Sequence, residues 1–298
     1  MPNAKLKNYL HLHFLVFIAG FTAILGELIT ITAIPLVWFR MLMALVLMFI
    51  YIKIARININ ISIKYITRYA FAGVIIALHW ITFFGSIDEA NISIALAMFS
   101  TGAFFASFLE PIIHKRRMIP YEVIFGILVV IGVFIITQSE IKYLTGILLG
   151  LASAFLAALF AVFNGKFLEQ NSATVISFYE FVGGVLFITL FIAIFGKGFS
   201  LDFFKLSTAD YGYLFILASI CTAYAFIAAV YVLKYLSPFT VVLTYNLEPV
   251  YGILLALIFF PEKEKMSSEF YIGAILIIAT VMINGIIKNS TKLKRRTS

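Results

Sequence analysis

Long apolar runs follow one another along almost the whole of this 298-residue chain and restrict the folds open to it. Hydrophobic residues make up 63% of the chain and charged residues only 12%, which is more apolar surface than a soluble domain of this length can bury. Each run is long enough to cross the ~30 Å hydrocarbon core of a bilayer. The ten predicted spans are 10–31, 34–54, 67–86, 91–113, 119–138, 145–166, 172–195, 210–233, 238–260 and 268–288.

The runs lack the strict alternation of a β-strand and are rich in Leu, Ala, Phe and Ile. Because a spanning segment must satisfy its backbone polar groups internally, they predict helices and not a β-barrel. The longest linkers, 55–66 and 196–209, are too short for a soluble domain. The sequence therefore predicts an all-α polytopic membrane protein. Its first run is predicted to be a retained helix, because it is too long for a signal peptide and contains Glu27.

The second half of the chain repeats the first at an offset of 147 residues. At this offset residues 119–136 align with 266–283, and residues 92–113 align with 239–260. About five spans separate the copies, and an odd number reverses the direction of the second copy in the membrane. We therefore predict two inverted five-helix repeats, 1–141 and 142–298, which would bind a substrate near the midplane where they meet.

The net charge of +8 is distributed in a way that predicts the orientation of the chain. With the N-terminus in the cytoplasm, sixteen Lys and Arg residues fall on the cytoplasmic side and five on the outer side, with Arg40 in the membrane. This bias predicts that both termini are cytoplasmic. High Ile, Lys and Asn usage favours a bacterial source, and hence the bacterial cytoplasmic membrane. The charge therefore indicates topology and not nucleic-acid binding.

Three features make the sequence resemble the EamA-type permeases of the drug/metabolite transporter superfamily. They are the arginine that ends P-L-V-W-F-R at 35–40, the Glu-Pro pair in L-S-P-F-T-V-V-L-T-Y-N-L-E-P-V at 236–250, and the E-x-x-x-G of Glu269 and Gly273. The resemblance covers almost the whole chain as two five-helix units. It implies a ten-helix transporter with alternating access around a central cavity, which moves amino acids, other metabolites or drugs, often outward. Glu27 departs from the family pattern, where a neutral residue is expected.

Glu248 is the deepest charged residue, about ten residues into its predicted span, and Pro249 follows it. Proline cannot donate a backbone hydrogen bond and crowds the carbonyl group of Tyr245, so we expect the helix to kink or open here. A carboxyl group beside freed carbonyl groups at this depth suits substrate contact or proton exchange. The alternative is a structural carboxyl group bonded to a neighbouring helix. Thr101 is the equivalent residue in the first repeat and is predicted to line the cavity.

Other polar and aromatic side chains are predicted to line the cavity with Glu248. His79 lies at mid-depth in the third span and is either a proton relay or a neutral histidine bonded to a hydroxyl group. The expected pocket is apolar with a few polar groups. The candidates for substrate binding or proton coupling are Glu248, His79, Trp80, Thr101, Tyr224, Tyr245 and Asn246.

Three charged residues are candidates for gates or structural ion pairs. Arg40 lies about two turns into the second span and Glu27 in the outer third of the first, and the short connection between these spans predicts that they pair. A short match between W-F-R and F-Y-E places Glu180 at the position equivalent to Arg40, on the inner side. Glu180 would support an inner gate, or bind Lys166 or a backbone group.

These features predict a secondary transporter of small amphipathic metabolites such as amino acids or drugs, and by resemblance an exporter. An integral membrane enzyme and a channel or facilitator for small solutes are the alternatives. An enzyme would need clustered acids, histidines or a nucleophile–base set, whereas the polar residues here are scattered singly over different spans. We therefore predict that the protein is not an enzyme.

The predicted partners are a small-molecule substrate, the lipid bilayer and protons as one candidate coupling ion. No nucleic acid, metal site or cofactor is predicted, and the single cysteine, Cys221, excludes an internal disulfide. The short linkers argue against a large soluble partner, and the chain is predicted to be a monomer or a weak homodimer.

Overall fold

The structure, a computed structural model, describes residues 2–115, 120–196, 198–232, 244–245 and 247–297. Within these residues every regular element is helical. The elements are α1 (Pro2–Leu28), α2 (Ala33–Ile54), α3 (Ile63–Glu89), α4 (Ile92–Phe99), α5 (Gly102–His114), α6 (Pro120–Ser139), η1 (Ile141–Tyr143), α7 (Leu144–Phe167), α8 (Ala173–Phe195), η2 (Leu201–Phe204), α9 (Thr208–Ala218), the π-helical segment η3 (Ser219–Tyr224), α10 (Ala225–Val232), α12 (Glu248–Phe259) and α13 (Ser268–Thr297).

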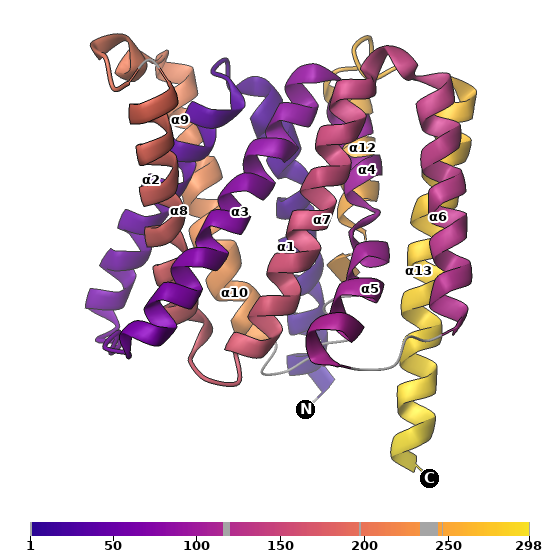
Figure 1. Cartoon of the computed structure of the whole chain (residues 1–298), viewed down its shortest axis with the longest axis horizontal. Coiled ribbons are helices and arrows are strands. Elements are labelled where there is room, and N and C mark those ends of the chain that lie inside the picture. Colours follow the sequence, from indigo (N-terminus) through magenta and orange to yellow (C-terminus); the bar gives the residue numbers. More distant parts are fainter. Residues whose placement is uncertain (1, 116–119, 197, 233–243, 246, 298) are drawn as a thin grey trace.

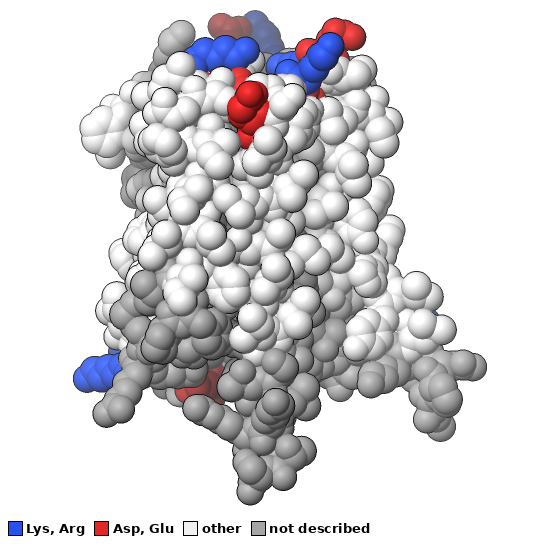
Figure 2. Space-filling model, turned by 90° about the vertical axis from the view of Figure 1, so that its right-hand side faces the viewer, with Lys and Arg blue, Asp and Glu red and all other residues white. Residues whose placement is uncertain are grey.

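Seven helical segments of the described chain are long and apolar enough to cross a membrane, and three shorter apolar helices accompany them. The helices stand side by side, and both termini lie at one end of the bundle, the lower end in Figure 1. On the face shown in Figure 2, the charged residues drawn in colour lie at the upper and lower ends, with an uncharged band between them. This distribution is typical of a multi-pass membrane protein.

The two repeats are interrupted at equivalent positions, which are 147 residues apart in the sequence. The predicted span 91–113 is interrupted, because α4 ends at Phe99 and α5 begins at Gly102. The residue equivalent to Gly102 is Pro249, which lies in the first turn of α12. The sequence predicted a kink or opening at this proline, and in the structure a helix begins there. The matched helices α6 and α13 run in opposite directions (Figure 1), as an inverted repeat requires.

Helices α3 and α8 come from different halves of the chain, and their backbones pack very closely. A Cβ atom added at Gly73 would lie 1.9 Å from the carbonyl oxygen of Glu180, and one added at Gly183 would lie 2.3 Å from that of Ala70. Since both obstacles are backbone atoms, neither can move aside without shifting a helix. The absence of a side chain at these two positions therefore lets the two halves meet.

The variant Gly73→Ala is expected to lower the free energy of unfolding by about 1–3 kcal/mol, the usual effect of forcing extra atoms into a packed contact. Gly165→Ala in α7 is the matched control, because a Cβ atom there would meet nothing within 4 Å. Thermal unfolding in detergent measures both variants. Equal midpoints for the two would contradict the close α3–α8 contact.

Candidate functional site

A cavity of about 530 Å³ lies between the two halves of the chain. Helices α1 to α4 form one side of it, and α7, α8, η3, α10 and α12 form the other. The wall is mainly apolar and aromatic, which is typical of small-molecule sites. The polar side chains among the lining residues are Thr22, Arg40, His79, Asn164, Ser177, Cys221, Tyr245 and Glu248.

The cavity reaches toward the lower end of the bundle. Its lining includes Asn164 and Leu168 where α7 ends, and Ala173 and Ser177 where α8 begins. The connection between these two helices lies at the lower end in Figure 1, on the side of the termini. The described state therefore has its cavity nearer to the end of the bundle that carries the termini.

Arg40 brings a buried positive charge to the cavity wall, with only 3% of the residue exposed. Its Nε donates a hydrogen bond to Oγ1 of Thr222 at 2.8 Å, and its guanidinium carbon lies 4.0 Å from the centre of the Trp80 ring. Its Nη1 has no hydrogen-bond partner. Across the described chain, no carboxylate lies within ion-pair distance of Arg40.

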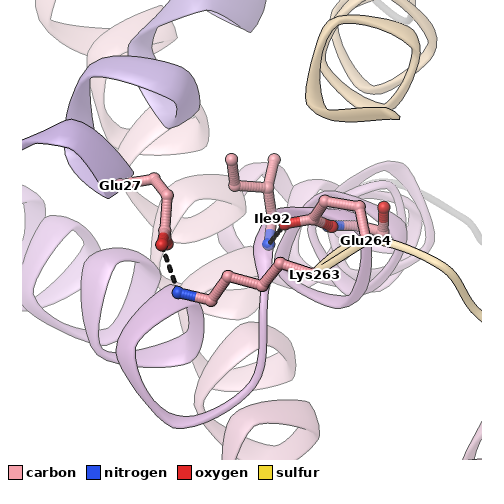
Figure 3. A network of polar contacts seen from close by, with 5 residues as sticks. Glu27, Ile92, Lys263 and Glu264 are labelled. Carbon is pink, nitrogen blue, oxygen red and sulfur yellow. Dashed lines mark hydrogen bonds and ion pairs between the residues drawn. The ribbon is translucent and has the colours of Figure 1, made fainter. Parts of the chain in front are cut away.

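The predicted pairing of Arg40 with Glu27 is wrong. Glu27 lies in the last turn of α1 and forms an ion pair with Lys263 in the α12–α13 connection, as Figure 3 shows. Arg40 lies two turns inside α2, where Thr222 and Trp80 hold its side chain against the cavity. The α1–α2 connection is short, but the two helices do not pack along each other: α1 packs mainly on α12, and α2 packs mainly on α8, α9 and α3. The short connection therefore does not bring these two side chains together.

His79 is held by the main chain and side chain of one residue on α7. Its Nδ1 lies 3.0 Å from the carbonyl oxygen of Ser153 and 2.9 Å from the hydroxyl oxygen of the same residue. Because a carbonyl oxygen only accepts, Nδ1 carries a hydrogen, and in the neutral form of the ring Nε2 is the acceptor. The sequence left two interpretations of His79, a proton relay and a neutral histidine bonded to a hydroxyl group. The contact with the Ser153 hydroxyl group is the one expected for the neutral histidine.

Glu180 reaches the cavity through another side chain. It is 2% exposed and accepts a hydrogen bond from Nδ2 of Asn164 at 2.7 Å. Lys166 and a backbone group were the predicted partners, and neither is the one observed, because the side chain lies between α8 and α7, where Asn164 faces it. Asn164 lines the cavity and Glu180 does not, so Glu180 can position Asn164.

Glu248 and Tyr245 lie where two cavities adjoin. Both line the central cavity and also a second cavity of about 330 Å³, which is walled by α4, α5, α7, α12 and α13. Pro249 lines only the second cavity. The first turn of α12 thus places the Glu248 carboxyl group beside both spaces.

Two other predicted binding residues, Thr101 and Tyr224, lie outside both cavities. Thr101 lines neither cavity and donates its hydroxyl hydrogen to the carbonyl oxygen of Met98 at 2.6 Å, within the turn between α4 and α5. The hydroxyl oxygen of Tyr224 lies 2.7 Å from Nε2 of His11, outside both cavities. Asn246 lies outside the described residues.

Two carboxylates that the sequence pattern did not point to accept hydrogen bonds from backbone N–H groups at the upper end. Asp210 accepts hydrogen bonds from the backbone N–H and the hydroxyl group of Thr30, at 2.8 and 2.9 Å. Glu264 accepts from the backbone N–H groups of Ile92 and Ser93, at 3.0 and 2.8 Å, where α4 begins. Figure 3 shows Glu264 beside the Glu27–Lys263 pair. The signal that could have found them is an acidic residue close to the outer end of a predicted span.

Comparisons with known proteins agree with this architecture. A solved structure described only as a crystal structure of a protein is similar to the chain, with a TM-score of 0.63 and 13% identity over 93% of this chain and 97% of that one. At this identity the likeness shows the fold alone. No curated protein compared with the chain matches it.

The model of the EamA-like transporter family matches the chain twice, over residues 7–138 and 144–286. One match falls in each half and the two cover most of the sequence, which confirms the resemblance carried by the three sequence features. The chain belongs to the EamA-like transporter family.

Proposed function

We propose that the protein is a secondary transporter that exports small amphipathic metabolites, such as amino acids or drugs, across the bacterial cytoplasmic membrane. The chain would cross the membrane ten times as two inverted five-helix repeats, with both termini in the cytoplasm. Family membership supports the transport of small solutes. The observation that carries the proposal is the cavity of about 530 Å³, which both halves wall and which contains Arg40, His79 and Glu248.

Alternating access would occur as the two halves rock around this cavity. The cavity lies nearer to the end with the termini, while Asp210 and Glu264 tie elements together at the opposite end. This arrangement supports an inward-facing state. Glu248 would contact the substrate or exchange a proton, and Glu180 would support the inner gate by positioning Asn164.

Counterflow in liposomes tests the proposal. Purified protein is reconstituted and challenged with a panel of amino acids and other metabolites, with and without a pH gradient. Saturable exchange of one compound is expected of a carrier. Flux that does not saturate would favour a channel, and turnover by the purified protein in detergent would favour an enzyme. Correctly oriented protein that exchanges no compound would contradict the proposal.

Replacing Ala161 with Trp is expected to reduce exchange at least tenfold, because Ala161 lines both cavities and an indole ring would fill the space between them. Ala193→Trp is the matched control, since Ala193 is exposed on the outside of α8. Size-exclusion profiles confirm that both variants fold. Equal exchange rates for the two would place the substrate path elsewhere.

A further inference from the structure

We infer that the transported molecule carries a carboxylate on an apolar body and that this carboxylate binds the Arg40 guanidinium inside the cavity. The inference rests on the proposed transport function and adds the charge class of the substrate. Three features of the cavity support it: the unsatisfied state of Arg40, the way in which Arg40 is held, and the composition of the surrounding wall.

The Arg40 guanidinium is buried without an anion beside it. A charge in such a place is unfavourable unless it is paired and hydrogen-bonded. Its contacts with Thr222, Trp80 and Phe84 (the ring centre of Phe84 is 5.6 Å away) orient the group but neutralise none of its charge. Its Nη1 remains a buried donor without a partner. An anion is the ligand that completes this site, and the planar guanidinium fork matches a carboxylate.

The position of the guanidinium is fixed before any ligand arrives. Thr222 lies in the π-helical segment η3, and its hydroxyl group donates to the carbonyl oxygen of Leu217, five residues earlier in α9, at 2.8 Å. This bond orients the oxygen of Thr222 to accept from Nε of Arg40. Segments of π-helix are frequent at functional sites. Thr222 is thus a positioning residue for Arg40.

Glu248 is the other charged residue in the cavity lining, as far as the described residues show. It interacts electrostatically with Arg40 but lies beyond ion-pair distance. The space between the two can therefore take a carboxylate on the Arg40 side, and an ammonium group, where the substrate has one, on the Glu248 side. The aromatic side chains of Phe83, Phe99 and Phe226 suit an apolar body.

Thermal unfolding of the whole protein in detergent, with matched compounds, tests the inference. Indole-3-propionate, its uncharged amide and tryptamine share one apolar body and differ in charge, and phenyl and isobutyl compounds extend the series. We expect the carboxylates to raise the unfolding midpoint more than the amides and amines do. Comparing tryptophan with indole-3-propionate identifies the source of the carboxylate. Tighter binding of tryptophan would indicate an amino acid, and weaker binding of tryptophan would indicate a simple carboxylic acid. Either result supports the inference.

The variants assign the binding to Arg40. Arg40→Gln is expected to weaken carboxylate binding about tenfold or more, and Arg68→Gln, at an exposed arginine of α3, to leave it unchanged. Should Arg40→Gln not fold, Thr222→Val keeps the charge but removes the acceptor for Nε, and is expected to reduce the preference for carboxylate over amide. Arg40→Lys is expected to restore part of the binding.

Three results would overturn the inference. The first is a shift with amines or amides but not with carboxylates, and the second is no shift with the carboxylates of all three bodies. The third is equal carboxylate binding by the folded Arg40 and Arg68 variants. These results differ from a failure of the proposed function, which counterflow tests separately. If an amine showed saturable counterflow, the protein would still be a transporter, and only the assignment of a carboxylate to its substrate would be wrong.

Discussion

Substrate exchange by the Glu248→Gln variant is expected to fall at least tenfold and to lose its response to a pH gradient. Glutamine keeps the shape of the side chain but cannot ionise, and Glu248 lies beside both cavities in the first turn of α12. A tenfold effect corresponds to about 1.4 kcal/mol, slightly less than the ~1.5–3 kcal/mol typical of a hydrogen bond to a charged group. Counterflow in liposomes at several pH values measures both effects.

The control for this variant is Glu269→Gln, the same substitution in the first turn of α13. Glu269 is exposed and lines neither cavity, so exchange should remain at the level of the unmodified protein. If Glu248→Gln exchanges substrate at the normal rate and with normal pH dependence, Glu248 neither binds substrate nor carries a proton. Its carboxyl group would then be structural, as the alternative interpretation of the sequence holds.

The largest effect on stability is expected for Glu264→Ala at the upper end of the bundle. Glu264 is fully buried, and its carboxylate accepts from two backbone N–H groups at the start of α4. The favourable charge of a carboxylate at a helix N-terminus would be lost as well. An unsatisfied buried N–H group is unfavourable by about 1–3 kcal/mol, so the loss of both bonds should destabilise the upper end of the bundle by about 2–6 kcal/mol.

Hydrogen exchange measured by mass spectrometry follows the amides of Ile92 and Ser93 directly. They should exchange at least tenfold faster in Glu264→Ala than in the unmodified protein. Glu262→Ala provides the control, because Glu262 is an exposed glutamate in the same α12–α13 connection. Indistinguishable exchange of these amides in the two variants would show that Glu264 does not stabilise the start of α4.

Much of the architecture could be predicted from the sequence because a bilayer restricts both the length and the polarity of the segments that cross it. The 147-residue offset related the helix break before Gly102 to the helix start at Glu248 and Pro249. Polar residues are rare in apolar spans, so the isolated Arg40 and His79 were conspicuous as candidates. Both line the cavity, with Trp80, Tyr245 and Glu248 beside them.

The remaining features depend on the direction in which side chains point and on contacts between distant segments. The pattern of residues along the chain does not predict either of these. Tyr224 ends a π-helical segment, and an extra residue in a turn changes the face on which later side chains lie, so its contact with His11 could not be predicted. Glu264 and the start of α4 are 172 residues apart, and only the folded bundle brings them together. The short connection between α1 and α2 likewise did not imply that Arg40 and Glu27 touch, because these two helices pack mainly on other helices.

The cavity itself contains a reporter for alternating access, because the single cysteine of the chain, Cys221, lines it. In oriented proteoliposomes, a membrane-impermeant thiol reagent is added to one side at a time, with and without an exchanged substrate, and Cys221→Ser is the unlabelled control. The proposed mechanism predicts labelling from the side of the termini alone at rest, and labelling from the opposite side as well once substrate drives exchange. Equal labelling from both sides, unaffected by substrate, would contradict a carrier and indicate an open pore.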